Sequence, residues 1–477
     1  MSDERKQVGG FKRTKIVCTL GPATDDDAIL RGMIDGGMDV ARLNLSHGKL
    51  DEHLARIQRV RRIAGDAGRH VAVMFDTRGP DIRIGDLDAA SVKLEKGKEF
   101  VLTGHPLVGN AQRASVSYPG LPKLLHPKDS VYLDDGLIEL EVIESGTDEV
   151  RCRIVAGGTL SPHKGVNVPG KIVPLPILTD ADVSDLKTGL NNGIDYIAAS
   201  FVRTSRDIED IRSALGGARV RIIAKIETAS GIENLGEIIK AVDGLMVARG
   251  DLGIEIPPEN VPGVQKRIIH ASRPMMKPVV TATEMLESMT RNPRPTRAEI
   301  ADVANAVLDG TSAVMLSQET AIGKYPVQAV EIMARVCRTA EMDLPFDPPL
   351  HREPGSKASL RGGIAHAAYF LAHDIDASAI ICITDSGRTA EHFSRLQPCQ
   401  PVLACTPDAA VARRLALYWG ILPIVVDEQE SVEALLGRAI DLGKAQGIMR
   451  KGDRIVFTGN LSGRGGETNL LASVVVG

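Results

Sequence analysis

From residue 15 onward, short runs of β-branched and other apolar residues alternate with longer stretches whose apolar positions recur every three to four residues. The short runs are typical of buried strands and the longer stretches of helices, so the alternation predicts parallel strands joined by crossover helices. The strand segments are Lys15–Leu20, Asp39–Leu45, His70–Thr77, Asp195–Phe201, Arg221–Glu227, Gly244–Arg249, Pro278–Thr283 and Ser312–Leu316. Eight such strands favour an α/β fold with a closed (β/α)₈ TIM barrel.

Residues 80–173 interrupt this rhythm with segments in which apolar and polar residues alternate with a period of two. Such a period is typical of half-buried strands, so we predict an inserted β-barrel domain. The strand segments are Ser91–Leu94, Phe100–Thr103, Val131–Ile143 and Val150–Val155. Gly79-Pro80 and the proline-rich segment 168–176 mark the points where the chain leaves and re-enters the barrel.

A second alternation of strands and helices follows a proline-rich linker at 343–354. Its strands are expected near 379–384, 401–405, 422–426 and 454–458, which predicts a separate C-terminal α/β domain. The domain limits are a tail at 1–10, the barrel at 11–79 and 174–345, the inserted domain at 80–173 and the C-terminal domain at 346–477.

Composition narrows the class of protein. The 57 Lys and Arg nearly balance the 61 Asp and Glu, which argues against general binding of nucleic acid or membrane surfaces, so any phosphate site must be local. No apolar run approaches the roughly 20 residues of a membrane span, and the N-terminus does not resemble a secretory signal. We therefore expect a cytoplasmic protein. Its six cysteines show no CxxC spacing, and we interpret them as reduced core residues.

Polar residues gather at the C-terminal ends of the predicted barrel strands, where barrels of this kind build their active sites. Glu227 and Asp251 suit Mg²⁺ or Mn²⁺, which accept one or two carboxylates and share substrate oxygens. Lys225 projects to the same side as Glu227 and could stabilise charge on a phosphoryl group or an enolate. A buried ion pair without a ligand is the alternative.

Two arginines are candidate phosphate clamps, because a guanidinium offers paired donors. They are Arg42, in the second strand, and Arg83, which could equally be a solvated surface residue. Several oxygen donors with a single carboxylate suit a monovalent cation, or else form a hydrogen-bonded network that closes the barrel. These donors are Asn44, Ser46, Asp76 and Thr77. His47 could face a nucleotide phosphate or cap a helix.

Two loops are candidate anion sites. Two glycines flank Asp251 just beyond the sixth strand, where backbone N–H groups could hold a carboxylate or phosphate, or form an ordinary turn. In the C-terminal domain, Thr384–Thr389 lies between a strand and a helix and could cradle a phosphate, or be a helix cap. The glycine-rich segment Gly459–Gly466 could complete that second pocket.

Several long motifs, in order along nearly the whole chain, resemble those of the pyruvate kinase family. They are Thr14–Pro22 (TKIVCTLGP), Arg42–Gly48 (RLNLSHG), Ile222–Glu227 (IIAKIE), Met246–Gly253 (MVARGDLG) and Asn292–Glu299 (NPRPTRAE). The resemblance implies an enzyme of glycolysis that transfers the phosphoryl group of phosphoenolpyruvate to ADP, giving pyruvate and ATP. It also implies Mg²⁺ (or Mn²⁺) and K⁺ as cofactors and a homotetramer.

The resemblance further implies roles for individual residues. Catalytic residues would be Lys225, Thr283 and Arg42. Phosphoenolpyruvate would contact Arg42, Lys225, Gly250, Asp251 and Thr283. Mg²⁺ would be held by Glu227 and Asp251, and K⁺ by Asn44, Ser46, Asp76 and Thr77. ADP or ATP would contact Asn44, His47, Arg83 and Lys164, under an inserted domain that closes as a lid. A phosphorylated allosteric effector would contact Thr384, Ser386, Gly387, Arg388 and Thr389.

One departure from the family bears on the monovalent cation. Where Asp81 stands, the family carries Glu in K⁺-dependent members and Lys in K⁺-independent ones. A carboxylate leaves no internal ammonium to replace the cation, so we expect this chain to depend on K⁺.

Two other functions fit part of the pattern. A barrel lyase or aldolase could stabilise a pyruvate enolate with Lys225, Glu227 and Asp251 without transferring a phosphoryl group. The inserted domain and Arg83 argue against it, because a lyase needs no nucleotide clamp. A catalytically lapsed metabolite sensor could use the C-terminal pocket alone, but retention of all the polar strand-end residues disfavours it.

Overall fold

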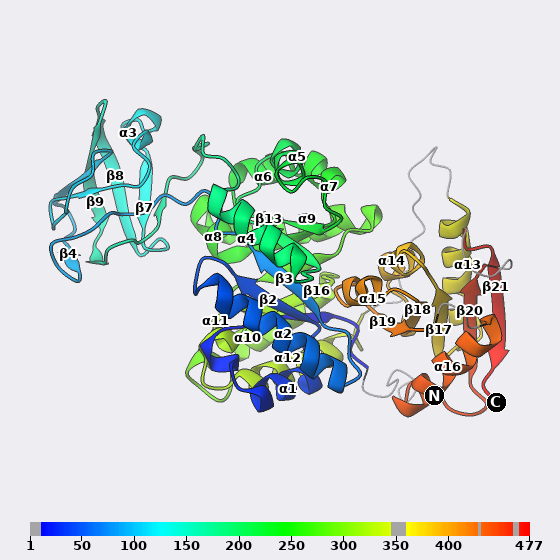
Figure 1. Ribbon diagram of the computed structural model, residues 1–477. Coiled ribbons are helices and arrows are strands. Elements are labelled where there is room, and N and C mark those ends of the chain that lie inside the picture. The colour runs from blue at the N-terminus through cyan, green and yellow to red at the C-terminus, as the bar shows by residue number, and fades with distance from the viewer. Residues whose placement is uncertain (1–10, 345–358, 428–430, 461–466) are drawn as a thin grey trace.

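The computed structural model describes residues 11–344, 359–427, 431–460 and 467–477. The expected tail at 1–10, most of the linker at 343–354 and most of the glycine-rich segment at 459–466 lie outside these residues. Figure 1 shows three bodies in a row, with the barrel in the middle, the inserted β domain (cyan) on one side and the C-terminal domain (orange to red) on the other.

Eight parallel strands close into a barrel in the order β1-β16-β15-β14-β13-β12-β3-β2. They are β1 (Lys15–Thr19), β2 (Val40–Asn44), β3 (Ala72–Asp76), β12 (Tyr196–Ala199), β13 (Arg221–Ile226), β14 (Gly244–Ala248), β15 (Val279–Ala282) and β16 (Ala313–Leu316). All eight predicted strands are confirmed, with ends that differ by at most two residues. They were recognisable because both faces are buried, which makes each strand a nearly continuous apolar run.

Helices surround the barrel. They are α1 (Asp27–Gly36), α2 (Leu50–Asp66), α4 (Asp180–Asn191), α5 (Ser205–Ala214), α6 (Ala229–Glu233), α7 (Leu235–Ala241), α8 (Arg249–Glu255), α9 (Val261–Ser272), α10 (Arg297–Leu308), α11 (Gln318–Ala321) and α12 (Pro326–Ala340). Alternate strand residues serve two cores: Ile16 and Cys18 pack toward the helices, while Val17 lies in the barrel interior. Leu417 of the C-terminal domain joins the interior cluster, so that domain is docked on the barrel.

The inserted domain is a curled six-stranded sheet with a two-stranded ribbon around its own core. Its elements are β4 (Val92–Leu94), β5 (Glu99–Thr103), β6 (Arg113–Ser115), α3 (Leu121–Leu124), β7 (Ser130–Leu133), β8 (Ile138–Ser145), β9 (Glu149–Ala156), β10 (Gly158–Leu160) and β11 (Val166–Asn167). The prediction of one strand over Val131–Ile143 is wrong. The chain turns at Asp134, Asp135 and Gly136, all with positive φ, because Asp and Gly tolerate the left-handed conformation.

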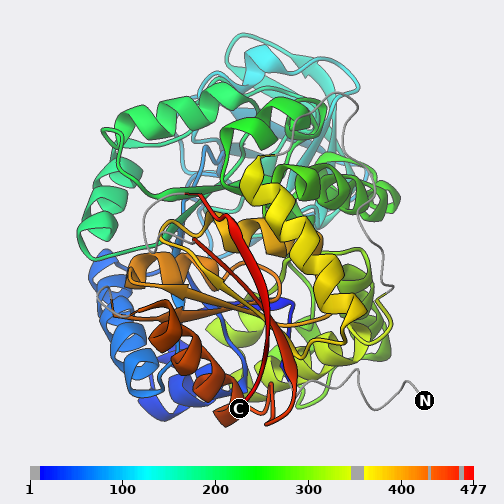
Figure 2. The ribbon, with the colours of Figure 1, turned by 90° about the vertical axis from the view of Figure 1, so that its right-hand side faces the viewer.

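The C-terminal domain has a five-stranded sheet in the order β19-β18-β17-β20-β21. Its elements are α13 (Leu360–Asp374), β17 (Ala379–Ile383), α14 (Arg388–Leu396), β18 (Val402–Thr406), α15 (Ala409–Leu415), β19 (Ile421–Val425), α16 (Val432–Ala445), β20 (Arg454–Gly459) and β21 (Leu470–Val475). The four predicted strands are confirmed, but β21 was missed; it pairs antiparallel with β20 and forms an edge of the sheet. Figure 2 shows α13 (yellow) crossing in front of the sheet near β21 (red).

Two expectations about the whole chain can be compared with the structure. All six cysteines are free and five are buried, but Cys399 is exposed in the loop after α14, so its prediction as a core residue is wrong. Among the described residues, no helix has both the length and the apolar character needed to cross a membrane.

Candidate active site

A cavity of about 320 Å³ opens at the C-terminal ends of the barrel strands, between the barrel and the inserted domain. We call it the mouth cavity. Ten of the predicted site residues line it: Arg42, Asn44, Ser46, His47, Thr77, Arg83, Lys164, Lys225, Glu227 and Asp251. Asp76 is fully buried against Arg42 and Lys225, while Gly250 and Thr283 contact each other next to Asp251. Segments far apart in the sequence therefore meet at one point.

Lys225, in β13, is the most tightly held of these groups. Its Nζ lies 2.8 Å from Glu227 Oε1 and 3.1 Å from Asp76 Oδ1, and it donates a hydrogen bond of 2.8 Å to Ser200 Oγ. Burial alone would lower the pKa of Lys225, but the charges of Asp76 and Glu227 outweigh it and hold that pKa above its ordinary value. The lysine is therefore a fixed positive charge in the mouth cavity.

Glu227, which is fully buried, and Asp251, which is partly buried, are two carboxylates beside this lysine. Burial raises the pKa of Glu227 to about 7, and the charge of Asp251 adds to the increase. Burial also raises the pKa of Asp251. Glu227 Oε2 accepts the Phe201 N–H at 2.6 Å, and Glu227 Oε1 has the Lys225 ammonium, 2.8 Å away, as its partner. Two neighbouring carboxylates whose pKa values are raised by burial fit a divalent cation, which would neutralise both.

No group of three or more His, Cys, Asp or Glu side chains in the described part of the chain is arranged to hold a metal ion. Glu227 and Asp251 would therefore supply only part of a coordination shell. This suits Mg²⁺, which usually binds one or two carboxylates and takes its remaining ligands from substrate and water.

The side chain of Arg42, in β2, is oriented by hydrogen bonds to two residues on adjacent strands. Its Nε donates to Asp76 Oδ2 at 2.6 Å and its Nη1 donates to Thr19 Oγ1 at 2.9 Å. Despite burial, Arg42 and Lys225 lower the pKa of Asp76, which stays ionised between them. The arrangement places two cations around one carboxylate, with paired guanidinium donors able to serve an anionic ligand.

Thr283 lies just after β15 in an unusual backbone conformation. Its φ is 68° and that of Glu284 is 55°, in the left-handed region that β-branched residues rarely adopt. Thr283 Oγ1 accepts the Gly250 N–H at 2.8 Å and donates to Ala282 O at 2.7 Å. The Gly250 N–H is thus already engaged by the threonine. Arg249 donates to Thr283 O at 2.8 Å and helps to hold this turn.

The oxygen donors predicted for a monovalent cation lie along β2 and β3. Asn44 is paired with Asp76 in the strand register, and Asn44 Oδ1 accepts the Ser46 N–H at 3.1 Å. Thr77 Oγ1 accepts the Ser200 N–H at 3.0 Å. Backbone donors hold both side-chain oxygens, and Ser200 Oγ lies 3.3 Å from Asp76 Oδ1.

The inserted domain brings two cations to the mouth cavity, each neutralised by a carboxylate. Arg83 lies 2.6 Å from Asp81 Oδ2 and donates to His163 O, while Lys164 Nζ lies 2.7 Å from Asp134 Oδ1. These ion pairs are partly exposed, so each contributes little to stability. His47 is exposed at the rim.

Some residues of the site were not predicted from sequence. Ser200 holds Lys225 and Thr77, and it follows β12, so the strand-end rule that selected the other residues would have found it. Thr19 ends β1, so the same rule would have found it too. Asp134 and Asp135 lie in the β7–β8 turn, which the prediction of one strand over Val131–Ile143 overlooked.

The predicted effector loop lies between β17 and α14. Thr384 Oγ1 accepts the Gly387 N–H at 3.0 Å, and Thr389 Oγ1 lies 2.8 Å from Thr468 Oγ1. Both threonines are buried, whereas Ser386 and Arg388 are exposed. The two threonine hydroxyls therefore shape the loop, and Ser386 and Arg388 are its outward groups.

Comparison with known proteins agrees with this geometry. The model of the pyruvate kinase barrel domain matches residues 11–330, and that of the pyruvate kinase alpha/beta domain matches residues 363–474. The chain belongs to the pyruvate kinase family. It is similar to the pyruvate kinase of Bacillus licheniformis, with 42% identity over 98% of this chain and 81% of that one.

Further relatives agree along the full length. The pyruvate kinase of Clostridium acetobutylicum is 41% identical over 98% of this chain and 100% of its own length. A crystal structure of a pyruvate kinase from Cryptosporidium parvum superposes with a TM-score of 0.92 at 37% identity, covering 100% of this chain and 98% of that one. The enzyme is a phosphotransferase that converts phosphoenolpyruvate and ADP to pyruvate and ATP. The lyase and sensor alternatives are not favoured.

Proposed function

We propose that the mouth cavity is the active site and that Lys225 stabilises the phosphoryl group during transfer. The observation that carries this proposal is the position of Lys225 Nζ, 2.8 Å from Glu227 and 3.1 Å from Asp76, at the strand ends. A fixed ammonium in a buried site is effective at stabilising charge that develops on phosphoryl oxygens.

Phosphoenolpyruvate would lie between the two barrel cations and the Asp251 turn. Its contacts would be Arg42, Lys225, Gly250, Asp251 and Thr283. Arg42 suits the phosphate because Asp76 and Thr19 occupy some of its donors and fix the direction of the others. Gly250 adjoins Asp251 at the start of α8, where Thr283 Oγ1 holds its N–H at 2.8 Å.

The divalent and the monovalent cation would each bind to a separate set of oxygen atoms. Glu227 and Asp251 would hold Mg²⁺ or Mn²⁺, which when bound supplies charge neutralisation on the substrate oxygens. Asn44, Ser46, Asp76 and Thr77 would hold K⁺, with Asp76 shared among K⁺, Arg42 and Lys225. Asp81 faces Arg83 with a carboxylate and provides no ammonium, which supports dependence on K⁺.

The nucleotide would bind under the inserted domain, which acts as a lid. Its contacts would be Asn44, His47, Arg83 and Lys164. ADP phosphates would replace Asp81 and Asp134 as partners of the two lid cations. Closure of the lid would exclude water and so limit hydrolysis of the phosphoryl group.

In the reaction, a terminal oxygen of ADP attacks phosphorus in line, the new P–O bond forms, and the bond to the enol oxygen breaks. Lys225 and Arg42 carry the charge on the phosphoryl oxygens, and the enolate of pyruvate remains. Protonation at its methylene carbon completes the reaction. Thr283 Oγ1, which holds its proton toward Ala282 O, would take part in that delivery together with water.

Regulation and assembly complete the proposal. A phosphorylated effector would bind at Thr384, Ser386, Gly387, Arg388 and Thr389, with the charge of Arg388 as the principal attraction. Arg388→Ala is expected to abolish activation by a panel of phosphorylated metabolites.

We also propose a cytoplasmic homotetramer with the domain limits given above. The outer edge of β21, which has no partner among the described strands, offers backbone groups to a second copy.

Pyruvate formation from phosphoenolpyruvate and ADP with Mg²⁺, measured for wild type and Lys225→Met, tests the proposal. Lys225→Met is expected to lower kcat by roughly 10²- to 10³-fold, because an aimed charge is lost from the site. Lys277→Met is the matched control, since Lys277 donates to Val242 O beside β15 at the other end of the barrel. Folded, metal-loaded wild-type protein that makes no ADP-dependent pyruvate would contradict the function. Retained turnover in Lys225→Met would contradict only the role of Lys225.

A further inference from the structure

A buried histidine of α2 lies directly behind the loop that carries Ser46 and His47. This histidine, His53, is 3% exposed, and its Nε2 lies 2.8 Å from the backbone carbonyl oxygen of His47. The loop, residues 45–49, joins β2 to α2 at the edge of the mouth cavity, and the His47 side chain is exposed at the rim. His53 does not line the mouth cavity, yet it holds the backbone of a residue that does.

The hydrogen bond fixes the protonation of the His53 ring. A carbonyl oxygen only accepts, so Nε2 carries the proton and donates it to His47 O. Nδ1 is buried and has no hydrogen-bond partner among the described residues. Burial lowers the pKa of His53, because the charged imidazolium would lose its hydration there. The ring is therefore a neutral donor in a single tautomer.

The orientation of this ring is set by packing. Phe75, fully buried in β3, meets the His53 ring edge to face, with 6.3 Å between the ring centroids and 64° between the planes. Phe75 is in turn confined by α4, since a Cβ added to Gly189 would lie 2.5 Å from Phe75 Cε2. The barrel core therefore fixes the direction of the Nε2–H donor before any ligand binds.

The loop comes close to His53 because residue 48 is glycine. Gly48 has a φ of 77°, in the left-handed region, and a Cβ added there would lie 3.6 Å from His53 Nε2. Two other hydrogen bonds of the loop are local: the Ser46 N–H donates to Asn44 Oδ1 at 3.1 Å and the His47 N–H to Asn44 O at 3.2 Å. These bonds close the turn on itself, whereas the bond from His53 ties residue 47 to the helix.

We propose that His53 is a positioning residue for the nucleotide: its Nε2–H fixes the His47 carbonyl and so holds the His47 side chain at the mouth cavity, where the ADP phosphates would lie. The inference rests on the nucleotide contact of His47 in the proposed function. His53 touches no reacting group, so its loss should weaken ADP binding and leave the chemistry at Lys225 in place. Without its buried donor, the His47 carbonyl must turn toward water, and the loop follows it.

Two substitutions of similar size separate the donor from the packing. In His53→Gln the amide nitrogen can take the place of Nε2, whereas His53→Met has the same length and no donor. Steady-state kinetics of the full-length enzyme, at saturating Mg²⁺ and K⁺, are expected to show a KM for ADP about tenfold higher in His53→Met, as the loss of one hydrogen bond to a buried group implies. The KM for phosphoenolpyruvate and kcat should stay within about twofold of wild type, and His53→Gln should recover most of the ADP affinity.

A double-variant cycle shows whether His53 acts through His47. His47→Ala is expected to raise the KM for ADP by itself, and adding His53→Met should raise it little further, because both changes remove the same contact. Isothermal titration with ADP measures the same differences without turnover. Ile57→Val is the control for packing, since Ile57 is fully buried about one turn further along α2, and it should keep the wild-type KM for ADP.

Four results would overturn the proposal: a wild-type KM for ADP in His53→Met, equal increases in the KM for both substrates, the same loss in His53→Gln as in His53→Met, or effects of His47→Ala and His53→Met that add fully. If His53→Met does not fold, His53→Asn replaces it, because the Asn amide nitrogen matches Nδ1 and does not reach His47 O.

The same variants distinguish this failure from failure of the proposed function. A raised KM for ADP in His47→Ala, with no change in His53→Met, would refute only the role of His53. An unchanged KM in both variants would contradict the nucleotide contact of His47 itself and, with it, the inference.

Discussion

Lys225 and Lys15 are buried lysines at opposite ends of the same barrel, and their pKa values are shifted in opposite directions. Burial lowers the pKa of Lys15 to about 8, because Asp39 is 4.0 Å away and is held more closely by Lys12. Burial acts on Lys225 as well, but Asp76 and Glu227 at 3.1 and 2.8 Å raise its pKa instead. The number of nearby carboxylates, not depth of burial, decides which lysine stays charged.

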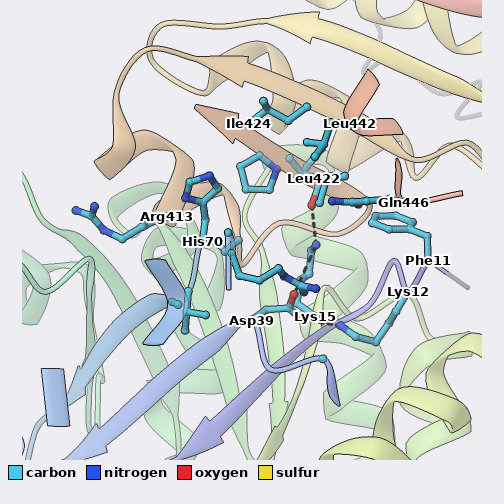
Figure 3. A pocket seen from close by; sticks show the side chains of 18 of the residues that line it. Phe11, Lys12, Lys15, Asp39, His70, Arg413, Leu422, Ile424, Leu442 and Gln446 are labelled. Carbon is cyan, nitrogen blue, oxygen red and sulfur yellow. Dashed lines mark hydrogen bonds and ion pairs between the residues drawn. The ribbon is translucent and has the colours of Figure 1, made fainter. Parts of the chain in front are cut away.

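The two shifts have opposite consequences for stability. The pKa of Lys15 is lower in the folded state than its ordinary 10.5, so its contribution to stability rises as pH increases from about 8 to 10.5. The pKa of Lys225 is raised, so its contribution is complete below 10.5 and is lost only at higher pH. Lys225 is balanced by two carboxylates at close range, whereas Lys15 has one carboxylate, that of Asp39, 4.0 Å away (Figure 3).

The largest expected effect comes from removing a carboxylate of the mouth cavity. Glu227→Gln is expected to lower kcat by roughly 10²- to 10³-fold and to raise the Mg²⁺ concentration needed for half-maximal activity, because it removes charge from the site. Steady-state kinetics over a Mg²⁺ series measure both. Asp309→Asn is the control, since Asp309 pairs with Lys266 outside the mouth cavity. An unchanged Mg²⁺ requirement in Glu227→Gln would contradict the assignment.

Replacing each lysine by methionine is expected to change the free energy of unfolding by different amounts at the two ends of the barrel. Lys225→Met leaves Asp76 and Glu227 buried without their cation and is expected to lower the free energy of unfolding by about 3–5 kcal/mol. Lys15→Met loses one hydrogen bond to Ile421 O but also removes a poorly neutralised buried charge, so the change should stay within about 1 kcal/mol. Urea denaturation of both variants measures the difference. Equal losses would mean that the two environments are equivalent.

Replacing the monovalent cation perturbs the mouth cavity less than a substitution does. Replacing K⁺ by tetramethylammonium is expected to remove most of the activity, because a bulky cation does not fit among the Asn44, Ser46, Asp76 and Thr77 oxygens. The rate of pyruvate formation at saturating phosphoenolpyruvate and Mg²⁺ is the measurement. Full activity in the K⁺-free buffer would refute the inference from Asp81.

Much of the fold could be predicted from the sequence, because patterns of neighbouring residues indicate the strands and helices. Each barrel strand is an apolar run buried on both faces, and the polar residues that end these runs line the mouth cavity. The prediction failed at two places. Asp134-Asp135-Gly136 is itself a turn signal, which the prediction of one strand over Val131–Ile143 overlooked. β21 was missed because it is a partly exposed antiparallel edge strand, unlike the strands that are buried on both faces.

The sequence by itself determined the elements, their order and the kinds of side chain at the strand ends, because period, turn residues and motifs are properties of neighbouring residues. Only the tertiary structure decided which charges meet. Lys225 is paired with Asp76, and Lys12 with Asp39, through strands brought together by barrel closure. Lys15 meets Ile421 O only because the C-terminal domain docks against the barrel. Electrostatic energy depends on distance and burial, and neither is fixed by position along the chain.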